Sequence, residues 1–174
     1  MKPLPRQARL VFVLLCLAAS ACSAPPNPPG EKSPATPVAD DTAARIAAVE
    51  RIVDGDTIKL RNGERVRYIG VDTPELARDG RPAQPFALEA MECNRALLGN
   101  GTVKLVFDEE RTDRYGRLLA YVYAGPDHTM MVNRELVRRG CARTLSIAPN
   151  TAHAREFRKL ERAARAARRG LWAR

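Results

Sequence analysis

The 174-residue sequence is poor in cysteine and histidine, and its apolar runs are short. Four cysteines are too few for a disulfide-dense miniprotein. The two histidines, His128 and His153, give little support to a zinc hydrolase, whose metal is usually held by several nitrogen or sulfur ligands. The apolar run from Leu10 to Ala19 has ten residues. A membrane-spanning helix needs ~20 residues, so we favour another role for this run.

Apolar residues and positive charge are the two abundant features of the chain. Hydrophobic residues make up 45% of it and recur periodically, which argues against a wholly disordered protein. The length allows one domain of ordinary size. Lys and Arg total 29 against 20 Asp and Glu, a net charge of +9. The charges before residue 45 nearly cancel, so the excess belongs to residues 45–174.

The first 44 residues have the pattern of an export signal followed by a tether. We interpret residues 1–21 as a signal peptide, because basic residues precede the apolar run and Ala19-Ser20-Ala21 is a small-residue cleavage pattern. Followed by Cys22, the same residues also resemble a permissive bacterial lipobox, which would make Cys22 an acylated first residue. We favour lipidation, because residues 22–44 contain six prolines and form a flexible tether. We expect an exported protein: a cell-envelope lipoprotein held to a membrane by its lipid anchor, or a secreted or periplasmic protein.

Only two cysteines, Cys93 and Cys141, remain beyond the tether. In an oxidising compartment they can form one disulfide. The alternative is a pair of buried thiols that pack as small hydrophobic groups. The sequence leaves both alternatives open.

Turn signals divide residues 45–174 into short strands and helices. Three strands are predicted first, separated by Asp54-Gly55 and by the hairpin turn Asn62-Gly63, over residues 45–53, 58–61 and 65–71. A helix from Pro85 then precedes two further strands, over residues 102–107 and 117–123.

Two more helices are predicted to end the chain. The first covers residues 133–139, and the second begins at Asn150, which we expect to cap it, and stops before Gly170. Its predicted apolar stripe is His153, Phe157, Leu160, Ala164 and Ala167. Five strands with a helix between the third and fourth have the element order of an OB-type Greek-key barrel. We therefore predict a mainly β domain with α-helices, in which a five-stranded barrel packs with three helices.

Three charged clusters lie where a half-buried sheet usually has apolar residues, at residues 54–57, 67–75 and 111–117. Each could be an ordinary turn or a solvated loop when taken alone. Together they supply three carboxylates and two arginines, namely Asp56, Asp72, Glu75, Arg67 and Arg117. Oxygen ligands with few histidines favour calcium or magnesium, and guanidinium groups bind phosphate in a bidentate manner. These groups suit the hydrolysis of a phosphodiester.

The segments VDGDTIKL, VRYIGVDTPE, RTDRYGR and LVRRGCA, in this order, resemble the staphylococcal nuclease (thermonuclease) family. The resemblance covers about Ile46 to Arg174. It implies a calcium site formed by Asp56, Asp72 and the backbone carbonyl of Thr73. It also implies a catalytic trio of Arg67, Glu75 and Arg117, and substrate contacts from Arg114 and Tyr115. For Tyr115, packing against the barrel is the alternative.

The same resemblance implies a Ca²⁺-dependent enzyme that hydrolyses DNA and RNA with low sequence specificity and leaves 3′-phosphate ends. Glu75 would act on the attacking water, and the two arginines would stabilise charge on the phosphoryl group. We expect a monomer. The alternative is a non-catalytic OB-type module, tethered at the cell envelope, that binds nucleic acid or protein.

One segment of the sequence departs from the family pattern, and the C-terminal segment carries an excess of positive charge. The family's best-known members carry a tyrosine-bearing segment after the second helix that lines the base pocket, whereas the corresponding segment here, ARTLSIAPN, has no aromatic residue. We therefore expect weaker base stacking on that side. Residues 150–174 contain eight basic and two acidic residues, which we interpret as a solvated helix face with a secondary, non-specific attraction for nucleic acid.

Overall fold

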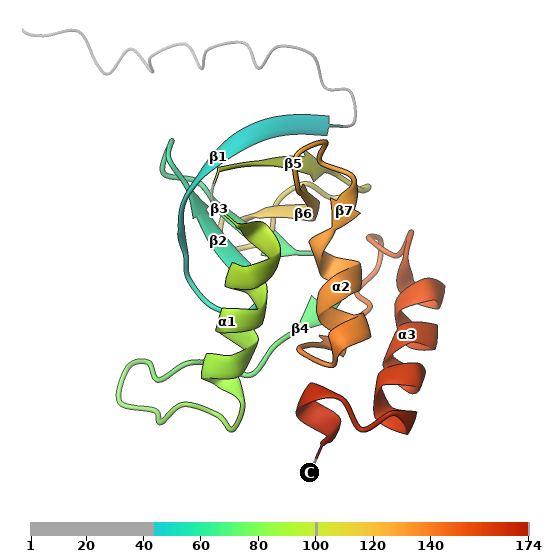
Figure 1. The fold of residues 1–174 in the computed structure, drawn as a ribbon. Coiled ribbons are helices and arrows are strands. Elements are labelled where there is room, and N and C mark those ends of the chain that lie inside the picture. Colours follow the sequence, from blue (N-terminus) through green and yellow to red (C-terminus); the bar gives the residue numbers. More distant parts are fainter. Residues whose placement is uncertain (1–43, 100, 174) are drawn as a thin grey trace, which may run out of the picture. The chain divides into compact units, whose positions relative to one another are not determined.

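The computed structural model describes residues 44–99 and 101–173, so the predicted signal peptide, Cys22 and all but the last residue of the predicted tether lie outside the described residues. Five strands form a closed barrel (Figure 1). They are β1 (Ala44–Ile52), β2 (Thr57–Leu60), β3 (Arg65–Tyr68), β5 (Thr102–Val106) and β6 (Leu118–Ala124). β1 pairs antiparallel with β2 and β5, β2 with β3, and β5 with β6, while a parallel pairing of β3 with β6 closes the barrel. The predicted OB-type barrel is confirmed.

Alternate residues of the strands fill the barrel. Val103 and Leu105 are buried on one face of β5, as the sequence pattern predicts. Large side chains from the other strands complete the core, among them Ile58, Leu60, Val66, Tyr68 and Val122. Burying each such side chain stabilises the fold by about 1.5–3 kcal/mol. The interior is therefore a packed core, and any ligand must bind on the outside.

The three predicted helices are present as α1 (Ala87–Leu98), α2 (Val132–Arg139) and α3 (Ala154–Ala166). α2 packs between α1 and α3 (Figure 1). Its Asn133 fixes it to the barrel, because the side-chain amide accepts a hydrogen bond from Val122 N–H (2.8 Å) and donates one to the carbonyl of Ile69 (2.9 Å). None of the helices within residues 44–99 and 101–173 combines the length and apolar character needed to cross a bilayer.

A disulfide joins Cys93 of α1 to Cys141, just beyond α2. Of the two alternatives left by the sequence, the structure therefore has the bonded one. Disulfides persist in oxidising compartments, so the bond indicates a location outside the cytoplasm.

The predicted strand over residues 65–71 is wrong in one respect, because the chain bends at Gly70. Gly70 has a φ of 80°, and the Ile69 carbonyl is held by Asn133, so the strand divides into β3 and the two-residue β4 (Val71–Asp72). β4 leaves the barrel and pairs with β8 (Arg143–Thr144). β8, β7 (Met130–Met131) and the 3₁₀ turn η1 (Gly170–Trp172) were not predicted, since elements this short have no periodicity.

Asn150 does not cap α3, contrary to the prediction. The helix begins after His153, and the Asn150 side chain instead bonds to the backbone of Glu110. Its Oδ1 accepts from the Glu110 N–H (2.8 Å) and its Nδ2 donates to the Glu110 carbonyl (2.7 Å). The Asn150 amide has both a donor and an acceptor. It can bond both the N–H and the carbonyl of Glu110, whereas a helix N-terminus would use only its acceptor. Of the predicted stripe on α3, Phe157 and Ala164 are fully buried, whereas Ala167 is exposed.

Candidate active site

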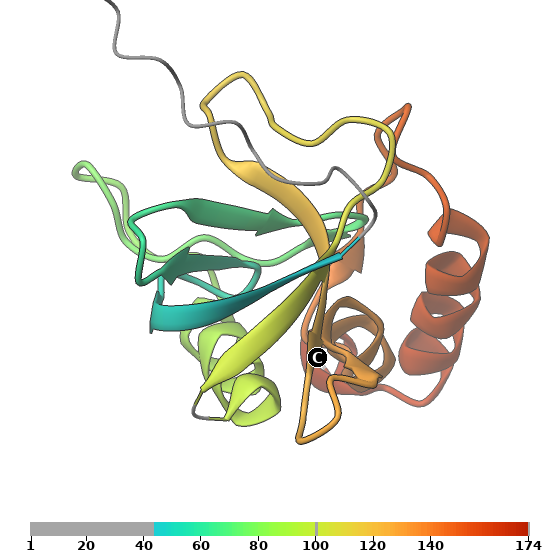
Figure 2. The ribbon, with the colours of Figure 1, turned by 90° about the horizontal axis from the view of Figure 1, so that it is seen from above.

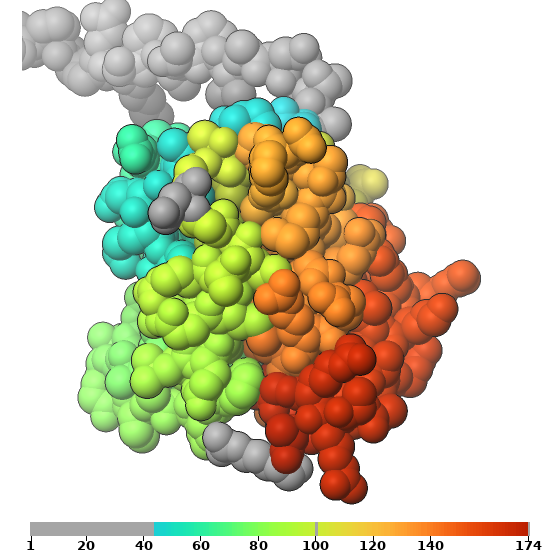
Figure 3. All heavy atoms as spheres, viewed as in Figure 1, coloured from blue at the N-terminus to red at the C-terminus, as the bar shows by residue number. Residues whose placement is uncertain are grey.

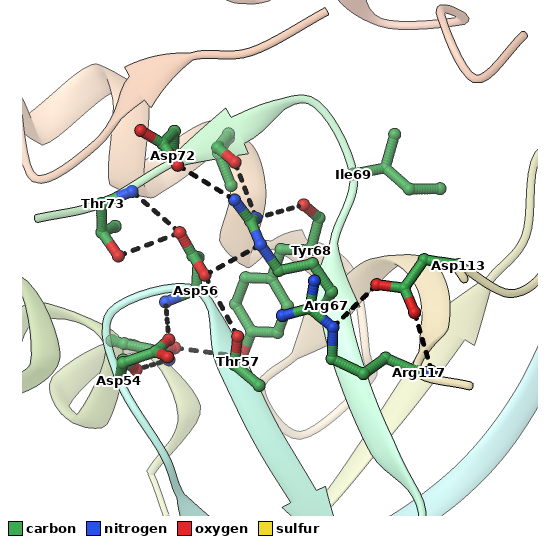
Figure 4. A network of polar contacts seen from close by, with 12 residues as sticks. Asp54, Asp56, Thr57, Arg67, Tyr68, Ile69, Asp72, Thr73, Asp113 and Arg117 are labelled. Atoms are coloured by element: carbon green, nitrogen blue, oxygen red, sulfur yellow. Dashed lines mark hydrogen bonds and ion pairs between the residues drawn. The ribbon is translucent and has the colours of Figure 1, made fainter. Parts of the chain in front are cut away.

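The first part of the site is the turn that leads into β2, where Asp56 lies almost fully buried. Its Oδ2 accepts hydrogen bonds from the backbone N–H (2.8 Å) and the hydroxyl (2.9 Å) of Thr73 (Figure 4). The neighbouring Gly55 permits this approach, because a Cβ there would lie 2.6 Å from the Thr73 hydroxyl oxygen. The Asp-Gly-Asp-Thr turn and the end of β4 are thus locked together.

The guanidinium of Arg67 lies between two carboxylates. Its Nε is 3.2 Å from Asp56 Oδ1, and its Nη2 is 3.2 Å from Asp72 Oδ1 (Figure 4). Its Nη1 donates to the carbonyls of Tyr68 (2.9 Å) and Val71 (2.7 Å), so the bend between β3 and β4 wraps around the arginine. The Arg67 side chain is only 14% exposed. Its orientation is therefore fixed before any substrate binds.

Burial works against the charged form of both carboxylates. It raises the pKa of Asp56 to about 6, although Arg67 opposes the shift. Burial also raises the pKa of Asp72, again against the effect of Arg67. The single guanidinium does not fully offset the cost of burying these charges. A bound cation would therefore stabilise the charged form of both carboxylates.

The residues predicted to bind calcium lie close together in the structure. Asp56 and Asp72 converge on one guanidinium, and Thr73 adjoins both of them. Ca²⁺ takes about six to eight oxygen ligands, including backbone carbonyls and water. Nowhere in residues 44–99 and 101–173 do three or more Asp, Glu, His or Cys side chains form a metal cluster. A cation held here would therefore draw its remaining ligands from carbonyl, water or phosphate oxygens.

The second arginine, Arg117, is held by Asp113 from the loop between β5 and β6. Arg117 Nε donates to Asp113 Oδ2 (2.7 Å), and Arg117 N–H donates to Asp113 Oδ1 (3.0 Å). Figure 4 shows Arg117 on the opposite side of Arg67 from Asp56 and Asp72. The carboxylate satisfies one edge of the guanidinium and leaves the rest available.

Arg67 and Arg117 line the same cavity of about 180 Å³. Its far wall is the segment before α3, which contributes Leu145, Ile147 and Asn150. Figure 2 shows this segment beside the loop that joins β5 to β6. Leu145 and Ile147 are 39% and 62% exposed, and no aromatic side chain stands in their place. The cavity thus combines two arginines and two acidic residues, Glu110 and Asp113, with a largely aliphatic wall.

The predicted substrate contacts, Arg114 and Tyr115, lie at the surface beside Arg117. Tyr115 is 68% exposed, so the alternative of packing against the barrel is wrong. The guanidinium carbons of Arg114 and Arg117 lie 4.8 and 5.6 Å from the centre of its ring, and Arg114 Nη2 donates to its hydroxyl (2.7 Å). These residues form an exposed cationic and aromatic rim next to the cavity.

Glu75 follows the Thr73-Pro74 turn and is exposed. Its backbone is anchored, because its N–H donates to Gln84 Oε1 (3.1 Å) and its carbonyl accepts from the Gln84 N–H (2.9 Å). Within the described part of the chain its carboxylate forms no hydrogen bond or ion pair. The structure therefore brings Asp56, Arg67, Asp72 and Thr73 into one network, sets Arg117 beside it, and leaves the Glu75 carboxylate outside.

Two residues of the site were not identified from the sequence. Asp113 lay inside the quoted motif RTDRYGR, four residues before Arg117, and this spacing was its only signal. Asn150 fixes the loop that carries Arg117, through its bonds to Glu110. Its partner is a backbone group 40 residues away, which sequence spacing cannot reveal.

The chain is similar in sequence to known proteins. The family described as "Staphylococcal nuclease homologue" matches residues 65–174. The chain is 36% identical over 127 residues to the thermonuclease of Staphylococcus hyicus, which covers 71% of this chain and 73% of that protein. It is 36% identical over 137 residues to the thermonuclease of Staphylococcus intermedius, covering 77% and 80% of the two chains. It is 39% identical over 129 residues to endonuclease YncB of Bacillus subtilis (strain 168), covering 71% of this chain and 60% of YncB. The chain belongs to the staphylococcal nuclease family.

Proposed function

We propose that this protein is a calcium-dependent nuclease that hydrolyses phosphodiester bonds in DNA and RNA. The observation that carries the proposal is the position of Arg67. Its guanidinium contacts both carboxylates of the proposed metal site, and the same residue lines the cavity together with Arg117. A phosphate in that cavity would meet both guanidinium groups, one of which contacts Asp56 and Asp72, the carboxylates that would hold the cation.

Each arginine has a distinct part in the proposed reaction. Arg67, fixed by four contacts, would bind a phosphate oxygen without reorganising as charge develops. Arg117, oriented by Asp113, would stabilise the charge that grows on the phosphoryl group and leaving oxygen. Arg114 and Tyr115 would hold the adjoining phosphate and sugar at the rim of the cavity.

Calcium bound by Asp56, Asp72 and the Thr73 carbonyl would supply a Lewis acid for a phosphate oxygen. Glu75 would accept a proton from the attacking water or orient it. The free, exposed carboxylate of Glu75 supports this role, since no internal partner competes for it.

The aliphatic wall supports low sequence specificity. Leu145, Ile147 and Ala148 have no side-chain hydrogen-bonding groups with which to distinguish bases. Hydrolysis to 3′-phosphate ends follows from the family resemblance. The disulfide favours action outside the cytoplasm, and acylation of Cys22 would hold the enzyme at a membrane.

The experiment that tests the function is incubation of the purified protein with single-stranded DNA and with RNA, in calcium and then in a chelator. Loss of intact polymer only with calcium is expected, and 3′-phosphate ends would be detected by mass spectrometry of the products. Glu75→Gln should retain binding and lose several orders of magnitude in rate. The matched control is Glu89→Gln, an exposed glutamate on α1. If neither polymer is cleaved, with calcium or without it, the result would favour the non-catalytic binding module.

A further inference from the structure

Helix α3 carries two acidic residues, and both are engaged by the domain. Glu156 accepts hydrogen bonds from Arg134 Nε (2.5 Å) and lies 3.1 Å from His153 Nδ1. Glu161 accepts from the hydroxyl of Thr144 (2.5 Å) and from Arg165 (2.9 Å). Neither acid is therefore available to neutralise the outer face of the helix.

The outer face of α3 carries four exposed cations that we call the α3 strip: Arg155, Arg158, Lys159 and Arg162. Across residues 44–99 and 101–173, none of their side chains forms a hydrogen bond or ion pair. Arg165 differs, because it pairs with Glu161 and its guanidinium carbon lies 3.8 Å from the centre of the Trp172 ring. In Figure 3, side chains of α3 project from the surface on the side away from α2. Like charges one turn apart on a helix repel each other. An anion bound along the strip would therefore reduce this repulsion.

The α3 strip begins next to the candidate active site. Asn150, which lines the cavity, stands four residues before the helix. The bond between Thr144 and Glu161 also holds the segment that forms the cavity wall against one flank of α3. Arg158 lies one turn before Glu161 on that flank, and Arg162 lies one turn after Arg158. A chain of phosphates leaving the cavity over this wall would reach the strip.

We propose that the α3 strip is a second phosphate-contact surface, over which a polynucleotide continues after it leaves the active site. Arg155 and Arg162 are separated by about 10 Å along the helix, from a rise of ~1.5 Å per residue. That length corresponds to about three phosphates of one strand of a duplex. This inference rests on the proposed nuclease function and adds a binding surface that the reaction itself does not need.

A polynucleotide suits the strip better than an anionic membrane. A helix that lies on a bilayer inserts an apolar face into it. The apolar face of α3, with Phe157 and Ala164, is packed inside the domain. The cationic face remains outside, and lysine and arginine side chains bind the phosphates of a nucleic-acid backbone.

The test measures binding without cleavage, in the presence of a chelator. The triple variant Arg158→Gln/Lys159→Gln/Arg162→Gln is compared with Arg51→Gln/Arg61→Gln/Arg65→Gln, which removes the same charge from exposed positions around β1 to β3. Fluorescence anisotropy with a labelled 30-nucleotide DNA is recorded over a range of salt concentrations, and calorimetry follows binding of a dinucleotide. The strip variant should bind the 30-mer about ten- to a hundredfold more weakly near 0.1 M salt, with a salt slope lower by about 2. Its affinity for the dinucleotide should change less than that for the 30-mer.

The possible outcomes distinguish a failure of the α3 strip proposal from a failure of the proposed nuclease function. Equal losses in the two triple variants would mean a general charge effect and would overturn the proposal. Unchanged binding of the 30-mer, together with lost binding to phosphatidylglycerol vesicles, would overturn it in favour of a membrane surface. If the unmodified protein cleaves DNA while the strip variant binds the 30-mer normally, only this inference fails. If the unmodified protein neither binds nor cleaves nucleic acid, the proposed function fails with it.

Discussion

Asp113 accepts two hydrogen bonds from Arg117. One carboxylate oxygen accepts from the guanidinium Nε, and the other accepts from the backbone N–H of the same residue. Burial raises the pKa of Asp113, but the hydrogen bonds from Arg117 and from the Tyr115 N–H lower it more, so the net pKa is below its usual value. The carboxylate is therefore charged at neutral pH and acts as a fixed counterion. The orientation of the Arg117 guanidinium depends on this carboxylate.

Asp113→Asn should reduce kcat/KM about ten- to a hundredfold, because it removes a charge-assisted hydrogen bond worth about 1.5–3 kcal/mol. The measurement is steady-state cleavage of DNA, with the melting temperature recorded alongside. Asp127→Asn, at an exposed aspartate outside the site, is the control. Equal rates for the two variants would show that Arg117 does not need Asp113 for its position.

Ile147→Tyr should strengthen substrate binding. Ile147 lines the cavity and is 62% exposed, so an aromatic ring there can stack on a base. Stacking contributes about 1–3 kcal/mol per base, which predicts a KM roughly five- to a hundredfold lower. Ile46→Tyr, at an isoleucine of β1 that is 56% exposed, controls for added aromatic surface. An unchanged KM for Ile147→Tyr would mean that bases do not lie against this wall.

Removing the disulfide should destabilise the fold and leave the site chemistry in place. The bond spans a sequence separation of 48 residues, for which loop-closure entropy gives about 4 kcal/mol. Urea unfolding of Cys93→Ser/Cys141→Ala against the oxidised protein measures the difference. Oxidised protein treated with a reductant should lose a similar amount. A loss below about 1 kcal/mol would indicate that the unfolded chain gains little freedom when the bond is broken.

Glu161 should make the stability of the domain depend on pH. Burial raises its pKa, but the hydrogen bonds from Thr144 and Arg165 lower it more, so its pKa in the folded state lies below 4.5. Its contribution is therefore present above pH 4.5 and is lost as the pH falls through the lower, folded-state value. At pH 7, Glu161→Gln should cost about 1–3 kcal/mol in the free energy of unfolding.

The measurement is urea unfolding of Glu161→Gln and the unmodified protein at pH 7 and near pH 3. The two should differ at pH 7 and converge in acid. The exposed Glu89 supplies the control through Glu89→Gln, for which no such convergence is expected. A difference that persists unchanged in acid would assign the effect of Glu161 to packing.

Much of the fold could be predicted because its signals are local. The turn at Asn62-Gly63, the alternation of Val103 and Leu105, and the helix that ends at Gly99 each depend on neighbouring residues. The bend at Gly70 could not be predicted in this way. It depends on Asn133, which is 64 residues from Ile69 in the chain. The same applies to Asn150, whose amide bonds a peptide group on a distant loop in place of capping α3.

The sequence by itself determined the barrel, the helices and the identity of the charged residues, because periodicity, turn chemistry and motif order are properties of adjacent positions. Only the tertiary structure decided that Arg67 bridges Asp56 and Asp72, that Arg117 is oriented by Asp113, and that Glu75 remains outside this network. It also decided that Cys93 and Cys141 are bonded. The physical reason is distance: ion pairs, hydrogen bonds and disulfides act over a few ångströms, and only the folded backbone brings these groups that close.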